Sequence, residues 1–97
     1  MEEISCEEAK KIISDIVEHG GVIFSDHAQD QMGLRGYSTR DVLYILKYGS
    51  VKKITKERNE RYNCQVHGKD IDGDEGTIIT IMIRRIKLVV VTVLGGV

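Results

Sequence analysis

The order of apolar and polar residues divides the chain into a first half with helical periodicity and a second half with strand periodicity. In the first predicted helix, apolar residues recur at the spacing of one helix face, at Ala9, Ile12, Ile13, Ile16 and Val17. Ser5 and Glu8 have the spacing of a capping box, which satisfies backbone N–H groups at a helix start. Gly20 and Gly21 suit the left-handed conformation in which many helices end. The pattern therefore predicts one helix between Ser5 and Gly20.

A short strand and a second helix are predicted next. The segment Val22–Phe24 is β-branched and aromatic, which favours a brief buried strand. Ser25 is a preferred helix N-cap, and Gly36 is a preferred helix end. A helix from Asp26 to Leu34 is expected between them.

A third helix is predicted to begin after Ser38 and to stop at Gly49, with Asp41 at the capping-box position. Its apolar residues are Val42, Leu43, Ile45 and Leu46. From Ser50 onward the apolar period changes to two, which is the period of a strand. Strands are expected near Val51 to Thr55, Arg61 to His67, Thr77 to Arg84 and Lys87 to Leu94.

These elements predict one α+β domain over residues 1–97. Only Arg85 and Ile86 separate the last two strands, so these should form a tight antiparallel hairpin. Three short helices are expected on one face of a mostly antiparallel sheet of about four strands, with Val22–Phe24 as a further edge strand.

Composition narrows the class of protein. The 97 residues are 41% hydrophobic and 30% charged, which is typical of a single globular domain. No apolar run approaches the roughly 20 residues of a membrane helix, so no membrane association is expected. Cys6 and Cys64 have neither zinc-site nor disulfide-framework spacing, which indicates reduced thiols in a cytoplasmic protein without a metal or other cofactor.

The net charge is -1, but the charge is unevenly distributed. Residues 1–45 carry nine acids and four bases, residues 46–67 carry two acids and six bases, and residues 68–97 carry four of each. The basic middle segment is either an ordinary solvated surface or a strip that faces phosphates.

His27 is a candidate for proton transfer because it lies in the first turn of a predicted short helix, near Asp26 and Asp30. It could donate a proton, accept one or contact a phosphate. The alternative is a structural histidine packed between helix and sheet.

One predicted strand has two chemically different faces. Side chains two apart share a face of a strand, so Arg61, Asn63, Gln65 and His67 form one polar row. The opposite row is apolar and consists of Tyr62, Cys64 and Val66. The polar row could bind a nucleotide phosphate and base edge, or it could be the solvent face of a sheet. Further cations that could bind phosphate are Arg35, Arg40, Lys52, Lys53, Arg58, Arg84, Arg85 and Lys87.

The segment Asp70-Ile71-Asp72-Gly73-Asp74 resembles the opening of a calcium-binding EF-hand loop. Its glycine comes too early, and the flanking segments read as strands rather than helices. An ordinary hairpin loop is the preferred interpretation.

The segment from Phe24 to Gly49 resembles domain-of-unknown-function family 4258, a small bacterial family. The pattern is Ser-x-His-Ala at a helix start, a methionine, and an Arg-Gly-hydrophobic-Ser turn before a helix that closes on glycine. In this chain the motif falls on His27, Ala28, Met32, Arg35, Gly36 and Ser38. The family pattern has a basic residue before its methionine, whereas this chain has Gln31. The resemblance extends over roughly residues 22–94.

Members of that family look like relatives of RelE-type and MqsR-type toxins, which cleave messenger RNA and are held inactive by an antitoxin. The resemblance implies a metal-independent endoribonuclease or an inactive relative, with RNA and an antitoxin as partners. Together with the cations above, it makes His27 and His67 the candidate catalytic residues. The candidate RNA ligands are Arg35, Arg61, Arg84 and Lys87. The alternative function is a non-enzymatic protein-interaction domain that uses a sheet edge or an apolar groove.

Overall fold

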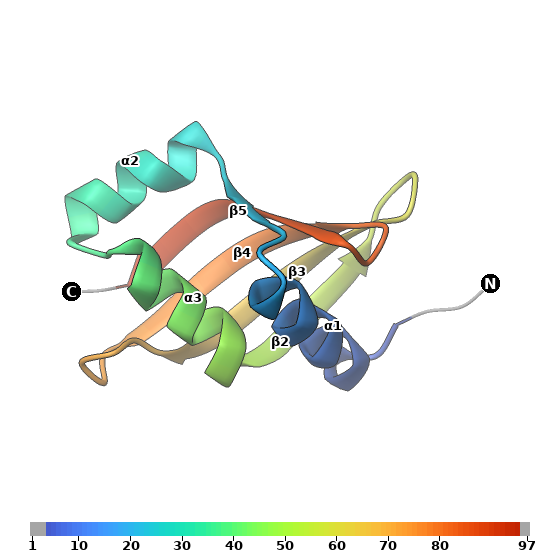
Figure 1. Ribbon diagram of the computed structural model, residues 1–97, viewed down its shortest axis with the longest axis horizontal. Helices are drawn as coiled ribbons and strands as arrows, with labels where there is room; N and C mark the ends of the chain where they lie inside the picture. Colours follow the sequence, from blue (N-terminus) through green and yellow to red (C-terminus); the bar gives the residue numbers. More distant parts are fainter. Residues whose placement is uncertain (1–3, 96–97) are drawn as a thin grey trace.

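A computed structural model describes residues 4–95 and contains three helices and five strands (Figure 1). The helices are α1 (Cys6–Glu18), α2 (Asp26–Arg35) and α3 (Thr39–Tyr48). The strands are β1 (Val22–Phe24), β2 (Ser50–Lys56), β3 (Arg61–Lys69), β4 (Glu75–Ile83) and β5 (Lys87–Gly95). Every element predicted from the sequence is therefore present in the described part of the chain. None of its helices is long and apolar enough to cross a membrane.

The helix boundaries follow the predicted capping signals. The Ser5 hydroxyl accepts the backbone N–H of Glu8 at 3.1 Å, and the Glu8 carboxylate accepts that of Ser5 at 3.1 Å. Ser38 and Asp41 form the same reciprocal pair at the start of α3. Gly36 ends α2 with φ of 72°, a conformation in which a residue with a Cβ would be strained. These local signals explain where α1 and α3 begin and where α2 ends.

The five strands form one mixed sheet in the order β1-β5-β4-β3-β2. The strands β2, β3, β4 and β5 pair antiparallel, while β1 pairs parallel to β5. The predicted antiparallel sheet with β1 at its edge is confirmed, and the fold is α+β.

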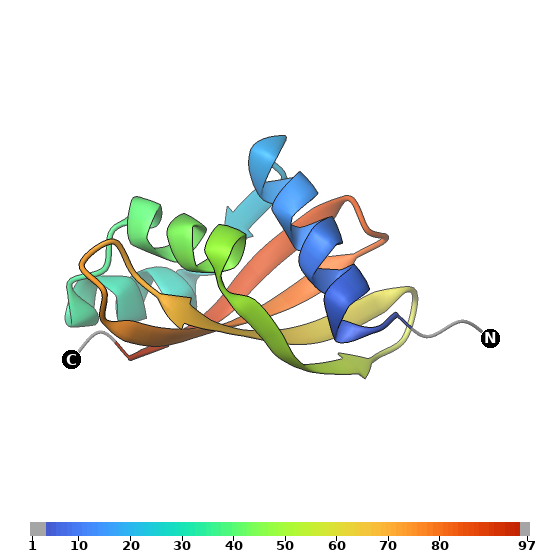
Figure 2. The ribbon, with the colours of Figure 1, turned by 90° about the horizontal axis from the view of Figure 1, so that it is seen from below.

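One face of the sheet is covered by helices, and the other is open (Figure 2). The covered side of β3 consists of the fully or almost fully buried Tyr62, Cys64 and Val66. Their neighbours on the alternate positions are the four members of the predicted polar row, which lie on the open side. The two-faced strand inferred from sequence is thus confirmed. We call the uncovered side of the sheet the open face.

Helix α2 lies along the edge of β5 beyond the end of β1, and two of its side chains bind that edge. The Gln31 Oε1 atom accepts the backbone N–H of Val93 at 2.7 Å. The Nε–H group of Arg35 donates to the Val93 carbonyl at 3.0 Å. A helix therefore satisfies strand groups that no neighbouring strand reaches, which protects the edge from pairing with another chain.

Candidate nucleic-acid interface

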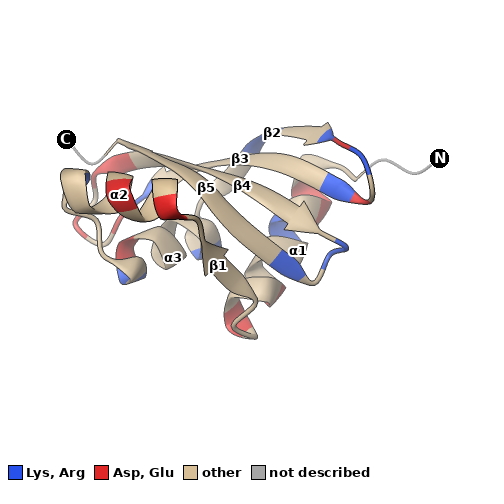
Figure 3. Cartoon of the chain, turned by 90° about the horizontal axis from the view of Figure 1, so that it is seen from above, with Lys and Arg blue, Asp and Glu red and all other residues tan. Residues whose placement is uncertain are grey.

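Two hairpin turns bring basic residues together at one end of the sheet (Figure 3). We call this the basic end, and its bases are Lys56, Arg58, Arg61, Arg84, Arg85 and Lys87. Arg61, Arg84 and Lys87 line a surface hollow of about 520 Å³ together with Asn59, Ile83 and Ile86. Three of the four predicted RNA ligands therefore share one hollow, although 26 positions separate Arg61 from Lys87 (87 − 61) in the chain.

The two turns at the basic end have the same backbone conformation. Asn59 and Glu60 have φ of 57° and 58°, and Arg84 and Arg85 have φ of 53° and 61°. The turns are also joined, because the backbone N–H of Arg84 donates to the Glu60 carbonyl at 3.1 Å. The sequence pattern placed Arg84 at the end of a strand, but it is the first of the two left-handed residues in the turn.

Left-handed pairs of this kind define the type I′ turn, which favours Asn-Gly because both central residues need positive φ. The left-handed conformation costs a residue with a Cβ roughly 1–2 kcal/mol. Arg84 and Arg85 therefore occupy positions at which conformational preference favours other residues.

A second hollow continues from the basic end along the open face. It has a volume of about 290 Å³, and its lining includes Lys53, Asn63 and Gln65. Lys53 pairs with Gln65 in the register of β2 with β3. The polar side chains of β3 therefore lead from Arg61 toward His67, and we call this row, with Lys53 beside it, the polar path.

His67 lies at the far end of the polar path, between a hydroxyl and a carboxylate. Its Nδ1 atom is 3.0 Å from the Thr77 Oγ1 atom, and its Nε2 atom is 3.0 Å from the Glu75 Oε1 atom. An ionised carboxylate only accepts hydrogen bonds, so Nε2 carries a proton and donates to Glu75. In neutral His67, Nδ1 is then an acceptor for the Thr77 hydroxyl.

The backbone at His67 is held by close packing of glycines. A Cβ on Gly49 would lie 2.5 Å from the His67 carbonyl oxygen, and a Cβ on Gly68 would lie 2.8 Å from the Gly49 Cα atom. Only glycine at both positions allows the corner between α3 and β2 to pass this closely over β3. The same contact fixes the strand that carries His67.

The predicted catalytic and RNA-binding residues do not form one compact site. His67 and Arg61 are six positions apart on β3, which corresponds to about 20 Å at the rise of a strand. The cations closest to His67 in the register of the sheet are Lys69, two positions along β3 on the same face, and Lys53, which pairs with Gln65 one row away. The structure therefore separates the cations that were predicted to bind RNA from the histidine that was predicted to transfer a proton.

His27 and Arg35 lie apart from the polar path, on α2. His27 is exposed, so the alternative of a histidine packed between helix and sheet is wrong. Arg35 uses its Nε–H group to bind the carbonyl of Val93 and has a structural role there. Gln31, the departure from the family pattern, accepts the N–H of the same residue.

Sequence reasoning did not select Glu75 or Thr77, and it counted Lys53 only among the candidate anion ligands. A signal was present for Thr77, because a hairpin centred on the acidic loop pairs it with His67 directly across the strands. Glu75 lies two residues before Thr77, so the two side chains share one face of β4. Lys53 could not be placed, because a bulge between Val51 and Lys53 shifts the register of β2.

The acidic loop, residues 70–75, is organised by one buried carboxylate. The Asp70 Oδ1 atom accepts the backbone N–H groups of Asp72 and Asp74, each at 2.9 Å. Asp41 supports the loop from α3 by accepting the N–H of Ile71 at 3.4 Å. Across residues 4–95, no three His, Cys, Asp or Glu side chains are grouped as metal ligands.

Comparison with known proteins gives one result. The model of a family described as a domain of unknown function (DUF4258) matches residues 24–94, whereas curated proteins and solved structures give no match. The matched segment begins in β1 and ends in β5, and it therefore includes α2, α3 and every strand of the polar path. The chain belongs to the DUF4258 family.

Proposed function

We propose that this chain is an RNA-binding domain of the toxin type, a metal-independent endoribonuclease or its inactive relative, controlled by an antitoxin in the cytoplasm. The observation that carries this proposal is the convergence of Arg61, Arg84 and Lys87 on one hollow at the start of the polar path. Arginine and lysine side chains in an open hollow provide charge-assisted contacts to phosphate oxygens. The resemblance to RelE-type and MqsR-type toxins supports the same class of substrate.

The conformation of Arg84 and Arg85 supports a function for the basic end. Each holds a left-handed φ that glycine or asparagine would adopt at lower cost. Backbone strain of this kind is found mainly at functional sites, where the side chains are needed for binding or catalysis rather than for folding. Contact with an anionic strand is such a purpose.

His67 is the better placed of the two histidines for proton transfer. Glu75 orients the ring and leaves Nδ1 as the acceptor. A ribose 2′-hydroxyl could replace the Thr77 hydroxyl as donor to Nδ1, and its oxygen could then attack the adjacent phosphorus. Lys53 would stabilise the negative charge of that phosphorane, and the departing 5′-oxygen would take a proton from solvent.

The first test measures RNA binding by variants of the two matched turns. Arg84→Asn combined with Arg85→Gly relieves the strain but removes two positive charges, so we expect higher thermal stability and RNA affinity about 10-fold lower, which is roughly 1.4 kcal/mol. Glu60→Gly relieves the same strain in the neighbouring turn and removes an acid, so stability should rise without loss of affinity. Fluorescence anisotropy with a labelled single-stranded RNA at low salt, and thermal unfolding, give both quantities. Equal affinity of both variants would contradict the proposed role of the basic end.

The same RNA serves for cleavage in the presence of a chelator. Replacement His67→Gln should lower the cleavage rate by about 100-fold or more, in the range of general acid–base catalysis. The exposed His27→Ala is the comparison, because it alters a histidine outside the polar path. If only the His27 variant lost cleavage, His27 on α2 and not His67 would be the residue that transfers the proton.

A second candidate function is a non-enzymatic protein-interaction domain. The observation that favours it is the open face, where β4 and β5 carry apolar side chains on the side that no helix covers (Figure 2). Absence of RNA binding at low salt would make this the better account.

A further inference from the structure

The open face is divided into a polar half and an apolar half. The polar half is the polar path on β3 with its β2 neighbours. The apolar half lies on β4, β5 and β1, and its apolar side chains are Ile23, Ile79, Ile81, Ile83, Val89 and Leu94. Two threonines, Thr77 and Thr92, lie beside them on the same side, opposite Leu94 and Ile79. In the register of the sheet, Ile81 lies opposite Val89, and Val89 lies opposite Ile23, so they form one apolar row across three strands.

The pattern of β4 is that of a strand covered on both sides. On its covered side Ile78 and Met82 are fully buried. On its open side it carries three isoleucines, whereas a strand with one solvated face alternates apolar and polar residues, as β3 does. Among described exposed side chains, Ile23 and Leu94 are 48% and 37% accessible at the margins of this apolar half. Contiguous apolar surface of this kind is characteristic of an interaction site.

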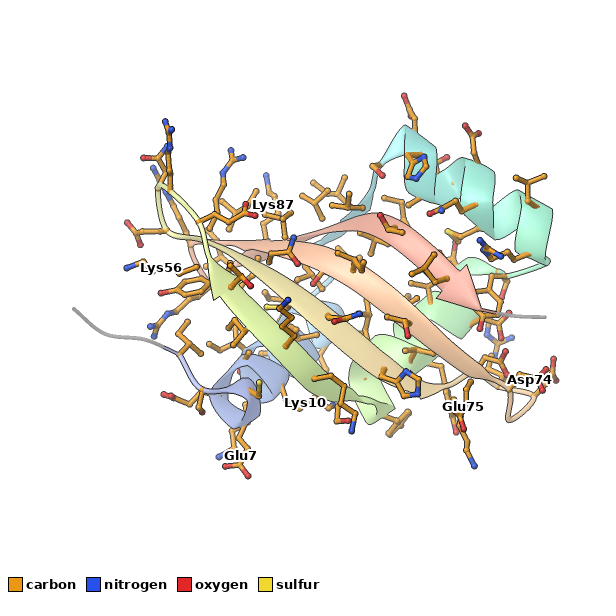
Figure 4. The ribbon with its side chains drawn as sticks, turned by 180° about the vertical axis from the view of Figure 1, so that it is seen from behind. Glu7, Lys10, Lys56, Asp74, Glu75 and Lys87 are labelled. Carbon is orange, nitrogen blue, oxygen red and sulfur yellow. The ribbon has the colours of Figure 1, made fainter. Side chains whose placement is uncertain are left out.

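The two ends of the same face carry opposite charge. Six bases and two acids lie in residues 56–61 and 84–87 at the basic end, whereas residues 69–75 at the other end carry four acids and one base. Figure 4 shows Lys56 and Lys87 at one end of the open face, with Asp74 and Glu75 at the other. The charge of the open face therefore changes from positive to negative along its strands, and we call this change its charge direction.

We propose that the open face binds a second copy of this chain, face to face, with the basic end of each copy over the acidic end of the other. Such a dimer has a twofold axis that lies in the plane of the interface and is perpendicular to the strands. This axis places each strand over the same strand of the other copy, in the opposite direction. The apolar half then faces the apolar half, and the basic end faces the acidic end. An axis parallel to the strands would place like charges together, so the charge direction selects the first arrangement.

The size of the face fits such a dimer. The five strands are three to nine residues long, and at a spacing of about 4.8 Å and a rise of about 3.3 Å per residue they give a projected area of roughly 600 Å². A standard interface buries about 800 Å² of accessible surface per partner, and a corrugated face has more accessible surface than its projection. The open face is therefore of the size that a dimer interface needs. The dimer would cover the polar path, so RNA should compete with it, and this consequence alone rests on the proposed function.

The test measures molecular mass without RNA, by sedimentation and light scattering from about 5 to 200 μM protein. The mass should rise from the 10.9 kDa of one chain toward twice that value. Ile81→Lys should keep the chain monomeric throughout, and Leu94→Lys, at the more exposed margin, provides the same test if the first variant misfolds. A constant mass of one chain in the unmodified protein, or unchanged association in both folded variants, overturns the proposal.

A charge exchange tests the orientation. Lys87→Glu and Asp74→Lys each place like charges together in the proposed dimer, so each should weaken association about 10-fold. Both side chains are exposed, so neither change threatens folding. The double variant restores opposite charges between copies and should recover association. A double variant weaker than either single variant overturns the arrangement, even if a dimer forms.

Discussion

At the scale of single residues, Tyr37 connects the junction of α2 and α3 to the acidic loop. Its side chain is 8% exposed, and its hydroxyl is buried near the Asp70 carboxylate. Two causes raise the pKa of Tyr37 to about 12. The larger is burial of the hydroxyl, and the second is the negative charge of Asp70. A neutral hydroxyl is therefore part of the folded state.

This pKa predicts a loss of stability at alkaline pH. The pKa of tyrosine is about 10 in the unfolded chain, so the unfolded state releases its proton first as pH rises. The free energy of unfolding should fall between pH 10 and 12 by up to about 2.7 kcal/mol from this group. Spectrophotometric titration of the phenol absorbance should show one tyrosine ionising near pH 12, and Tyr37→Phe should remove it. Retention of that step in the variant would assign it to another tyrosine.

At the scale of elements, α2 closes the edge that β1 leaves open on β5. Val93 has its N–H group bound by Gln31 and its carbonyl bound by Arg35. Ser25 extends the same connection, because its backbone N–H donates to the Val90 carbonyl at 3.0 Å. The helix that carries the family motif is therefore fixed to the sheet through polar contacts as well as through buried Ala28 and Met32.

Replacement Gln31→Ala should destabilise the protein because it leaves the Val93 N–H without its acceptor. The expected cost is about 1–2 kcal/mol, the penalty of an unsatisfied partly buried donor. Asp30→Ala is the matched control on the same helix, since Asp30 is exposed and should change stability by less than about 0.5 kcal/mol. Urea unfolding measures both values. Equal stability of the two variants would mean that Gln31 does not contribute to edge closure.

At the scale of the whole molecule, a net charge of -1 conceals two oppositely charged ends. The basic end and the acidic loop lie at opposite ends of β3 and β4, so their fields do not cancel at either surface (Figure 3). An anionic ligand should therefore bind at one end despite the overall charge.

Salt dependence tests this charge separation. If Arg61, Arg84 and Lys87 contact three phosphates, the logarithm of the RNA association constant should fall with the logarithm of salt concentration with a slope of about -2. Substitution of Arg84 and Arg85 as above should make the slope less steep by about 0.7, the contribution of one phosphate contact. Titrations between low and physiological salt give both slopes. A slope near zero would exclude phosphate contact as the source of affinity.

The sequence by itself determined the elements and their faces, because these depend on local interactions. Serine caps, glycine ends and the change of period from helix to strand specify each segment within the residues that form it. Alternation along β3 likewise specified the polar row before its neighbours were known. Arg61 lies near Lys87 because β3 pairs with β4 and β4 pairs with β5. That pairing depends on all three strands and cannot be read from any one of them.

The tertiary structure decided the contacts of the His67 ring with Glu75 and Thr77, and it alone gave Arg35 an edge-closing role. A motif in the sequence records that these residues occur, but their contacts depend on strand register and on where α2 packs. Register also depends on the bulge at Lys52, which lies between Val51 and Lys53 and has no signal in the pattern of apolar residues. Side-chain contacts between distant segments are therefore determined by the assembled sheet, and the candidate site could be resolved only there.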